Sequence, residues 1–309
     1  MTTAARLRTF VAVADAGSVR AAAQRLVVTE SAVSAAVAAL TREVGVPLLE
    51  RAGRGLRLTP SGRTYAEYAR TILGLHEESL AAARGDADPE HSRVRIAAVT
   101  TAGEHVLPAV LASFRQHHPG VDLGLDVGTR EHVWTLLASH AADLVIAGRP
   151  PSSLGATVRA IRPNSLVVVG SPATATTFPA GRATWLMREA GSGTRATCEA
   201  LLAGLDVDPP TLTLGSNGAV VAGAIAGLGV TLVSRDAVSS SLAAGDLVEL
   251  AVPHTPMRRP WHAVTPGQAS AAASLLVAYL LDQDLPDKER WRRPPGRRPS
   301  PGRSTRRVM

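Results

Sequence analysis

Apolar residues recur at helical spacing through the first 45 positions, in three consecutive segments. The first segment carries Phe10, and residues 18–26 and 29–44 form two further stretches around a short corner. Ser18 and Thr29 stand at the start of these two stretches, where a hydroxyl can accept hydrogen bonds from the free N–H groups of a helix. The third stretch has apolar residues at intervals of four, three and four: Val33, Val37, Leu40 and Val44. The pattern predicts a helix-turn-helix with a supporting first helix.

Two short extended runs follow, at residues 46–50 and 56–59, and the glycines between them permit a hairpin turn. A hairpin beside a helix-turn-helix is a wing, and its arginines suit contact with phosphates or the minor groove. A solvated surface charge is the alternative for each arginine. The residues that we expect to face double-stranded DNA are Ser18, Arg20, Thr29, Glu30, Ser31, Ser34, Ala35, Arg51, Arg54 and Arg57.

Residues 60–90 predict a long linker helix followed by a hinge. Pro60 fits the first helical position, and apolar residues then recur at spacings of three, four and three: Tyr65, Tyr68, Ile72 and Leu75. A helix of about 24 residues is roughly 36 Å long, too long for a small head to cover. We therefore expect this helix to pack against a partner helix; packing on the chain's own later domain is the alternative.

Beyond residue 91, strands alternate with helices, which is typical of a parallel α/β architecture. The pattern includes a helix from Thr100 to about His117, restarts after Arg149 and returns through residues 261–264 to a final helix. Two such halves form a cleft, the usual place for a ligand. We expect an effector domain over 91–285, with lobe I formed by 91–160 and 263–285 and lobe II by 161–262.

Three strand-to-helix turns point at this cleft. They contain Thr100-Thr101, Thr129 after Gly128, and the run Gly191–Thr194. Helix N-termini offer free N–H groups and positive partial charge, and glycines let a ligand approach the backbone. A Gly-Ser-Gly-Thr turn taken alone is more often plain capping, but the two-lobed setting favours a site for a small anion.

Residues 5–62 also resemble a known family. Phe10, Gly17-Ser18, Ala32-Val33-Ser34, Gly45–Leu48 and Leu58–Gly62 resemble the winged helix-turn-helix of LysR-type transcriptional regulators. The later domain resembles the family's effector domain, which is itself similar to periplasmic solute-binding proteins. The resemblance implies a fold of α plus α/β class, operator DNA as partner, a homodimer or tetramer, and RNA polymerase as a further candidate partner.

The run Arg188–Arg195 indicates one subgroup of this family. Together with residues 100–104, 128–131 and 147–151 it resembles the subgroup that controls carbon-fixation operons and its sulfur-metabolism relatives, which sense small anionic metabolites. The effector residues that this resemblance implies are Thr100, Thr101, Thr129, Arg149, Ser192, Thr194, Arg195 and Asn217. The identity of the metabolite does not follow from the resemblance.

The recognition helix departs from the family pattern. A typical member carries Gln and Arg on its exposed face, whereas this chain has Glu30, Ala35 and Ala36 there and no basic residue before Arg42. Arg and Gln make the bidentate contacts that discriminate between bases. We therefore hypothesise a weaker or relaxed base readout, compensated by the wing.

Composition excludes several other classes. Cys198 is the only cysteine, no His/Cys cluster has metal-ligand spacing, and we expect neither a metal nor another cofactor. No signal peptide is visible, and the longest apolar run, residues 218–233, is shorter than the roughly 20 residues that span a bilayer. We expect a cytoplasmic protein without membrane contact.

The charge of the chain is concentrated at its end. Residues 286–309 hold nine basic and two acidic side chains, and their net +7 equals that of all 309 residues. This Pro-, Gly- and Ser-rich segment is predicted to be disordered, either as a solubilising extension or as a non-specific DNA tether.

The pattern as a whole predicts a transcription factor and not an enzyme. Two alternatives stay open at this point. One is an α/β enzyme or transferase that binds phosphate at the Gly191–Thr194 turn, and the other is an architectural DNA-binding protein without a ligand response.

Overall fold

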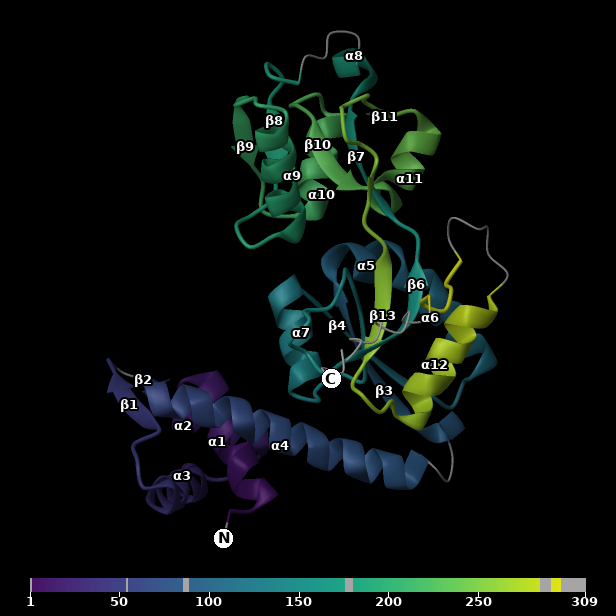
Figure 1. The fold of residues 1–309 in the computed structure, drawn as a ribbon. Coiled ribbons are helices and arrows are strands. Elements are labelled where there is room, and N and C mark those ends of the chain that lie inside the picture. Colours follow the sequence, from purple (N-terminus) through teal and green to yellow (C-terminus); the bar gives the residue numbers. More distant parts are fainter. Residues whose placement is uncertain (1, 54, 86–88, 176–179, 284–289, 296–309) are drawn as a thin grey trace, which may run out of the picture.

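The computed structural model describes residues 2–53, 55–85, 89–175, 180–283 and 290–295. It has a small N-terminal head, one long helix and a two-lobed α/β domain (Figure 1). Lobe I lies between the long helix and lobe II, so the chain has its DNA-facing candidate residues at one end and lobe II at the other (Figure 1). Arg54 and residues 286–289 and 296–309, for which predictions were made, lie outside the described residues.

The head is the predicted winged helix-turn-helix. Its elements are α1 (Ala4–Ala16), α2 (Val19–Leu26), α3 (Glu30–Val44), β1 (Leu49–Ala52) and β2 (Gly55–Leu58), with β1 and β2 paired antiparallel. The predicted caps are confirmed: the Ser18 hydroxyl accepts from the N–H of Ala21 at 3.1 Å, and that of Thr29 accepts from Ala32 at 3.2 Å. Phe10, Leu40 and Leu48 are buried where α1, α3 and the wing meet.

The long helix α4 (Pro60–Gly85) starts inside the head and leaves it. The Thr59 hydroxyl accepts from the N–H of Gly62 at 2.9 Å, as an N-cap does. Tyr65, expected on the outer stripe, instead packs edge-on against Phe10, with ring centroids 5.6 Å apart. The other three side chains of the stripe, Tyr68, Ile72 and Leu75, are exposed in this single chain, as is Leu80 further along the helix.

Lobe I is a five-stranded sheet covered by helices. In chain order it contains η1 (Pro89–His91), β3 (Arg93–Val99), α5 (Thr100–His105), α6 (Leu107–His117), β4 (Asp122–Gly128), α7 (Arg130–Ala138), β5 (Leu144–Ala147), β6 (Thr157–Arg162), β13 (Trp261–Thr265) and α12 (Ala271–Asp282). The strand order is β4-β3-β5-β13-β6. The single helix predicted from Thr100 to His117 is two helices, because Pro108 lacks an N–H and fits only the first turn of a new one.

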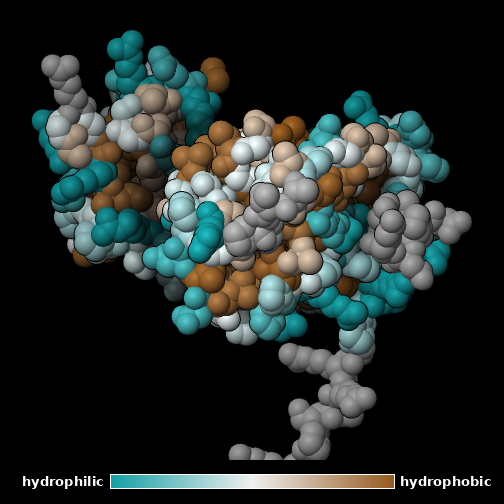
Figure 2. All heavy atoms as spheres, turned by 90° about the horizontal axis from the view of Figure 1, so that it is seen from above, coloured by the Kyte–Doolittle hydropathy of each residue, from teal (hydrophilic) through white to brown (hydrophobic). Residues whose placement is uncertain are grey.

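Lobe II contains β7 (Ser165–Gly170), α8 (Pro172–Ala175), β8 (Trp185–Met187), α9 (Gly193–Gly204), β9 (Thr211–Thr213), α10 (Asn217–Ile225), β10 (Thr231–Ser234), α11 (Arg235–Ala244), β11 (Val248–Glu249) and β12 (Met257–Arg258). Strand β7 pairs antiparallel with β10, β11 and β12, and β8 pairs parallel with β9. Figure 2 looks down onto this lobe and shows apolar patches interspersed with polar side chains.

The predicted parallel pairing holds for β3 with β4 and β5, and the rest of the lobe I sheet is antiparallel. Strand β13 runs antiparallel to both β5 and β6. The chain leaves lobe I through β6 and comes back from lobe II through β13, so these two strands run in opposite directions. Strand β6 extends to Arg162 and β13 begins at Trp261. Both lobe boundaries therefore lie about two residues inside the predicted lobe II, and the sequence pattern missed β6 and α11.

The predicted disorder of residues 286–309 is wrong for the described part, 290–295. Trp291 is 1% exposed and belongs to the lobe I core. The backbone of Arg292 exchanges two hydrogen bonds of 2.8 Å with Ile161 of β6. A large aromatic side chain and an open strand edge outweigh the disordering composition of the segment. None of the described helices is long and apolar enough to cross a membrane.

Candidate functional site

The outer face of α3 is the first candidate surface. Glu30, Ser31, Ser34 and Ala35 are exposed, whereas Val33 on the opposite side is buried. Arg20 of α2 and Arg51 of the wing are also exposed. The Arg57 guanidinium donates to the Glu50 carboxylate at 2.8 Å, which compensates its charge in the wing. Ser18 and Thr29 accept hydrogen bonds as caps, so their acceptor capacity is partly used within the head.

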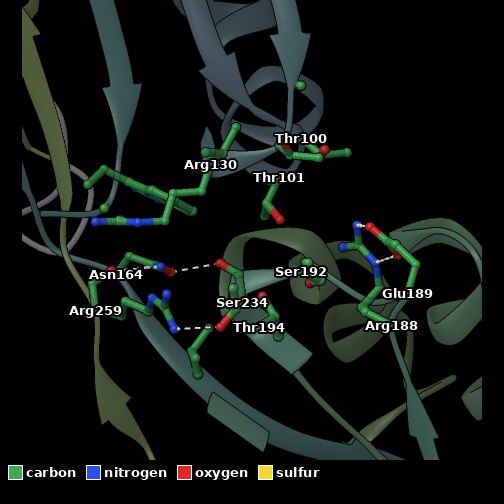
Figure 3. Close-up of a pocket in the computed structure, with 18 residues that line it drawn as sticks. Thr100, Thr101, Arg130, Asn164, Arg188, Glu189, Ser192, Thr194, Ser234 and Arg259 are labelled. Atoms are coloured by element: carbon green, nitrogen blue, oxygen red, sulfur yellow. Dashed lines mark hydrogen bonds and ion pairs between the residues drawn. The ribbon is translucent and has the colours of Figure 1, made fainter. Parts of the chain in front are cut away.

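A cavity of about 80 Å³ lies between the two lobes. Lobe I contributes Thr100 and Thr101 at the start of α5 and Thr129 and Arg130 at the start of α7. Lobe II contributes the turn before α9 and polar side chains from its strands and return segment: Asn164, Arg188, Glu189, Ser192, Thr194, Ser234 and Arg259. Figure 3 shows these groups converging from both sides.

Hydrogen bonds between side chains and backbone, and between side chains, hold the walls of the cavity in place. The hydroxyls of Thr129 and Ser192 cap α7 and α9, accepting from His132 and Arg195 at 3.3 and 3.4 Å. The Ser234 hydroxyl donates to the amide oxygen of Asn164 at 2.7 Å. Because the turns are held in this way, the first N–H groups of α7 and α9 keep fixed positions beside the cavity.

The charges in the cavity are unequal. Arg188 donates twice to the Glu189 carboxylate, both times at 2.7 Å, and this pairing lowers the pKa of Glu189. Arg130 donates to the carbonyl of Arg149 at 2.7 Å and lies over the ring of Trp134, 5.8 Å from its centroid. Arg259 donates to the carbonyl of Gly193 at 3.2 Å and to the Thr197 hydroxyl. Over the described ranges of the chain, no carboxylate pairs with either Arg130 or Arg259.

The guanidiniums of Arg130 and Arg259 repel each other, because neither has a carboxylate partner among the described residues. Burial lowers the pKa of Arg259, and the nearby charge of Arg130 lowers it further. Arg130 comes from lobe I and Arg259 from lobe II, so like charges face each other across the cavity (Figure 3). An anion between them would relieve this repulsion, because opposite charges attract strongly in a partly desolvated site.

Five of the eight predicted effector residues line the cavity: Thr100, Thr101, Thr129, Ser192 and Thr194. The other three are not among its lining residues. Arg195 donates to Glu199 at 2.8 Å and to the carbonyl of Arg188 at 3.0 Å. Asn217 is buried behind Arg188 and accepts from it at 3.3 Å, and Arg149 contributes its carbonyl to Arg130.

Sequence reasoning missed the cavity's arginines. Arg130 directly follows the predicted Thr129, and Arg188 opens the quoted glycine-rich run, so both carried a local signal. No local signal in the sequence pointed to Arg259. It reaches the cavity only because the chain returns from lobe II through β12 and β13.

A winged helix-turn-helix joined by a long helix to a two-lobed domain with an anion-suited cavity defines the class of ligand-responsive DNA-binding regulators. Comparison with known families agrees with this class. The model of the bacterial regulatory helix-turn-helix protein, lysR family, matches residues 4–63, and that of the LysR substrate binding domain matches residues 87–284. The chain belongs to the LysR family of transcriptional regulators.

Several members of this family are similar to the chain over most of its length. The chain is 34% identical to the HTH-type transcriptional regulator CfxR of Cupriavidus necator over 90% of each chain. It is 34% identical to CbbR of Rhodospirillum rubrum, over 89% of this chain and 94% of that one. The regulatory domain of Synechocystis CcmR, solved in complex with 2-PG, superposes with a TM-score of 0.55 at 27% identity, covering 60% of this chain and 94% of that domain. The relatives are named transcriptional regulators, so the enzyme alternative is set aside.

Proposed function

We propose that the cavity between the lobes binds a small anionic metabolite, and that this binding changes operator affinity or promoter geometry. The observation that carries the proposal is the pair Arg130 and Arg259, which face the cavity from opposite lobes without a carboxylate partner in the described chain. An anion that touches both guanidiniums would hold the lobes together. The 2-PG in the related CcmR domain supports an anionic effector.

The size of the cavity restricts the ligand. A space of about 80 Å³ is smaller than the roughly 150 Å³ apolar cavity that holds a benzene molecule. We expect one phosphate, sulfate or carboxylate group between Arg130 and Arg259, assisted by the N–H groups at the starts of α7 and α9. Glu189 lies in the same wall and would accept from a ligand hydroxyl, which favours a hydroxylated acid.

The head and α4 supply the response to the ligand. The exposed face of α3 would enter the major groove of operator DNA, with the wing on the adjacent backbone. The exposed side chains Tyr68, Ile72, Leu75 and Leu80 would be covered by α4 of a second copy, giving a dimer or, from two dimers, a tetramer. Such an assembly works in the cytoplasm, at promoters and beside RNA polymerase.

Thermal unfolding of the full chain with phosphate, sulfate or 2-PG tests the ligand site. A ligand at 100 times its Kd stabilises a protein by about 2.7 kcal/mol, which is a readily measured rise in Tm. We expect that rise in the wild type and in the control Arg115→Gln, an exposed arginine of α6, and its loss in Arg130→Gln. Operator gel shifts should respond to the same anion.

Two outcomes would contradict the proposed ligand site. If none of these anions raises the Tm, or if Arg130→Gln keeps the full rise, the proposed site is wrong. A protein that binds DNA identically with and without each anion would match the architectural alternative.

A further inference from the structure

The DNA-facing side of α3 lacks the usual hydrogen-bond donors. Glu30 is its first residue, and exposed positions beyond it carry short side chains: Ser31, Ser34, Ala35 and Ala38. The only basic residue of the helix is Arg42, in its last turn. The longest side chain at the leading end of the helix is therefore the carboxylate of Glu30.

Among the residues of the head that the structure describes, none pairs with the Glu30 carboxylate. The neighbouring hydroxyls of Thr29 and Ser31 lie 3.0 Å apart and bond to each other, and Thr29 also caps α3. Arg20 and Gln24 of α2 line the same shallow hollow as Glu30, yet no ion pair or hydrogen bond to Glu30 is formed among the described residues. The carboxylate is free to take a partner from outside the protein.

A carboxylate accepts hydrogen bonds and cannot donate them. In the major groove, donors are limited to the exocyclic amines of cytosine and adenine, whereas guanine and thymine present acceptors to the same space. Opposite an acceptor, Glu30 would lose its hydration without gaining a hydrogen bond and would also be repelled. Such a group discriminates chiefly by rejecting the wrong partner.

We propose that Glu30 is a specificity-determining residue that selects cytosine, through its N4 amine, at one position of each operator half-site. The inference rests on the family role of α3 as the DNA-reading helix. Arg20, exposed on α2 beside the same hollow, supplies charge for the phosphate backbone, so the acid at the base edge is tolerated.

Selection from a randomised duplex pool, followed by competition with singly substituted oligonucleotides, tests this role. The proteins are the full-length wild type, Glu30→Ala, Glu30→Gln and the control Glu104→Gln, which removes the same charge from an exposed position of α5. We expect the wild type to lose about tenfold to a hundredfold in affinity when that cytosine is replaced by thymine. The control should behave like the wild type.

The two Glu30 variants should differ from each other. Glu30→Ala should lose the preference at this one position, keep it elsewhere and bind non-specific DNA more tightly, because a repelled charge is gone. Glu30→Gln should move the preference to adenine, which an amide can contact with both a donor and an acceptor.

Unchanged base preferences in both Glu30 variants would overturn the inference while leaving operator binding and the ligand site intact. A wild type without any sequence-selective duplex binding would overturn it together with the role of α3 on which it rests. Equal unfolding temperatures of all four proteins would show that the exposed substitutions leave the fold unchanged.

Discussion

Gly74 of α4 packs directly on the backbone carbonyl of Ser139, the residue that ends α7. A methyl group at Gly74 would overlap that oxygen and would also lie 2.8 Å from the backbone of His140. One turn further along α4, Glu77 pairs with Arg95 of β3 at 3.3 Å, and Arg95 is held by Asp143 at 2.8 Å. Helix α7 therefore begins at the cavity, with Arg130, and ends against α4 (Figure 1).

Gly74→Ala should weaken this contact. Because backbone lies on the far side, α4 and lobe I must move apart, and overpacking of this kind costs about 1–3 kcal/mol. We expect a lower Tm together with a smaller effect of the anion on DNA binding. The matched control is Gly218→Ala in α10, where the added methyl meets nothing within 4 Å and the Tm should not fall. Equal Tm values for Gly74→Ala and the wild type would contradict the close packing.

Val27→Asn should stabilise the head. Val27 ends α2 with φ 56° and ψ 47°, a left-handed conformation that disfavours β-branched residues, and it is 90% exposed. Asparagine adopts this conformation more readily, so relief of up to about 1–2 kcal/mol is expected without loss of packing. Chemical denaturation measures the difference. A lower unfolding free energy for the variant would show that Val27 is not strained.

Trp291→Ala should destabilise lobe I. Removal of a fully buried large aromatic side chain costs about 3–5 kcal/mol. A chain truncated after Pro295 keeps Trp291 and the pairing of Arg292 with Ile161, so its unfolding temperature should equal that of the full chain. If truncation lowered the temperature as much as Trp291→Ala, the stabilising contact would have to lie beyond Pro295.

His262 should make stability depend on pH. Burial lowers its pKa below 6.5, the backbone carbonyl of Pro260 opposes this shift as a hydrogen-bond acceptor, and the charges of Arg149 and Arg130 add to it. The unfolded chain therefore binds the proton more readily, so stability is full above pH 6.5 and falls as the pH drops through that value. His262→Gln should lose this part of the pH dependence of the unfolding free energy. A pH profile parallel to that of the wild type would contradict it.

The head could be predicted from the sequence because its signals are local. Caps at Ser18 and Thr29 and the spacing of Val33 and Leu40 depend on neighbours within a few residues, and the structure has all of them. In the effector domain, the alternation of strands and helices was predictable, but β6, α11 and the antiparallel return of β13 were not. That pairing depends on where the chain crosses between lobes, which no local pattern encodes.

The candidate cavity shows the same division. The hydroxyl-bearing turns at Thr100, Thr129 and Ser192 were found because a strand followed by a capped helix has a recognisable pattern. Arg195 belongs to that pattern and yet turns to Glu199, since a carboxylate one helical turn away is its nearest partner. Arg259 enters from a segment about 65 residues later.

The place of Trp291 in the lobe I core has a consequence for synthesis on the ribosome. The helix-turn-helix is complete after about 60 residues, and every strand of lobe II has been made by Arg258. The lobe I core, which includes Val94, stays incomplete until Trp291 has been added. Domains fold as units while the chain emerges from the ribosome. Lobe I, which lies between the long helix and lobe II, therefore completes its folding after both the head and lobe II.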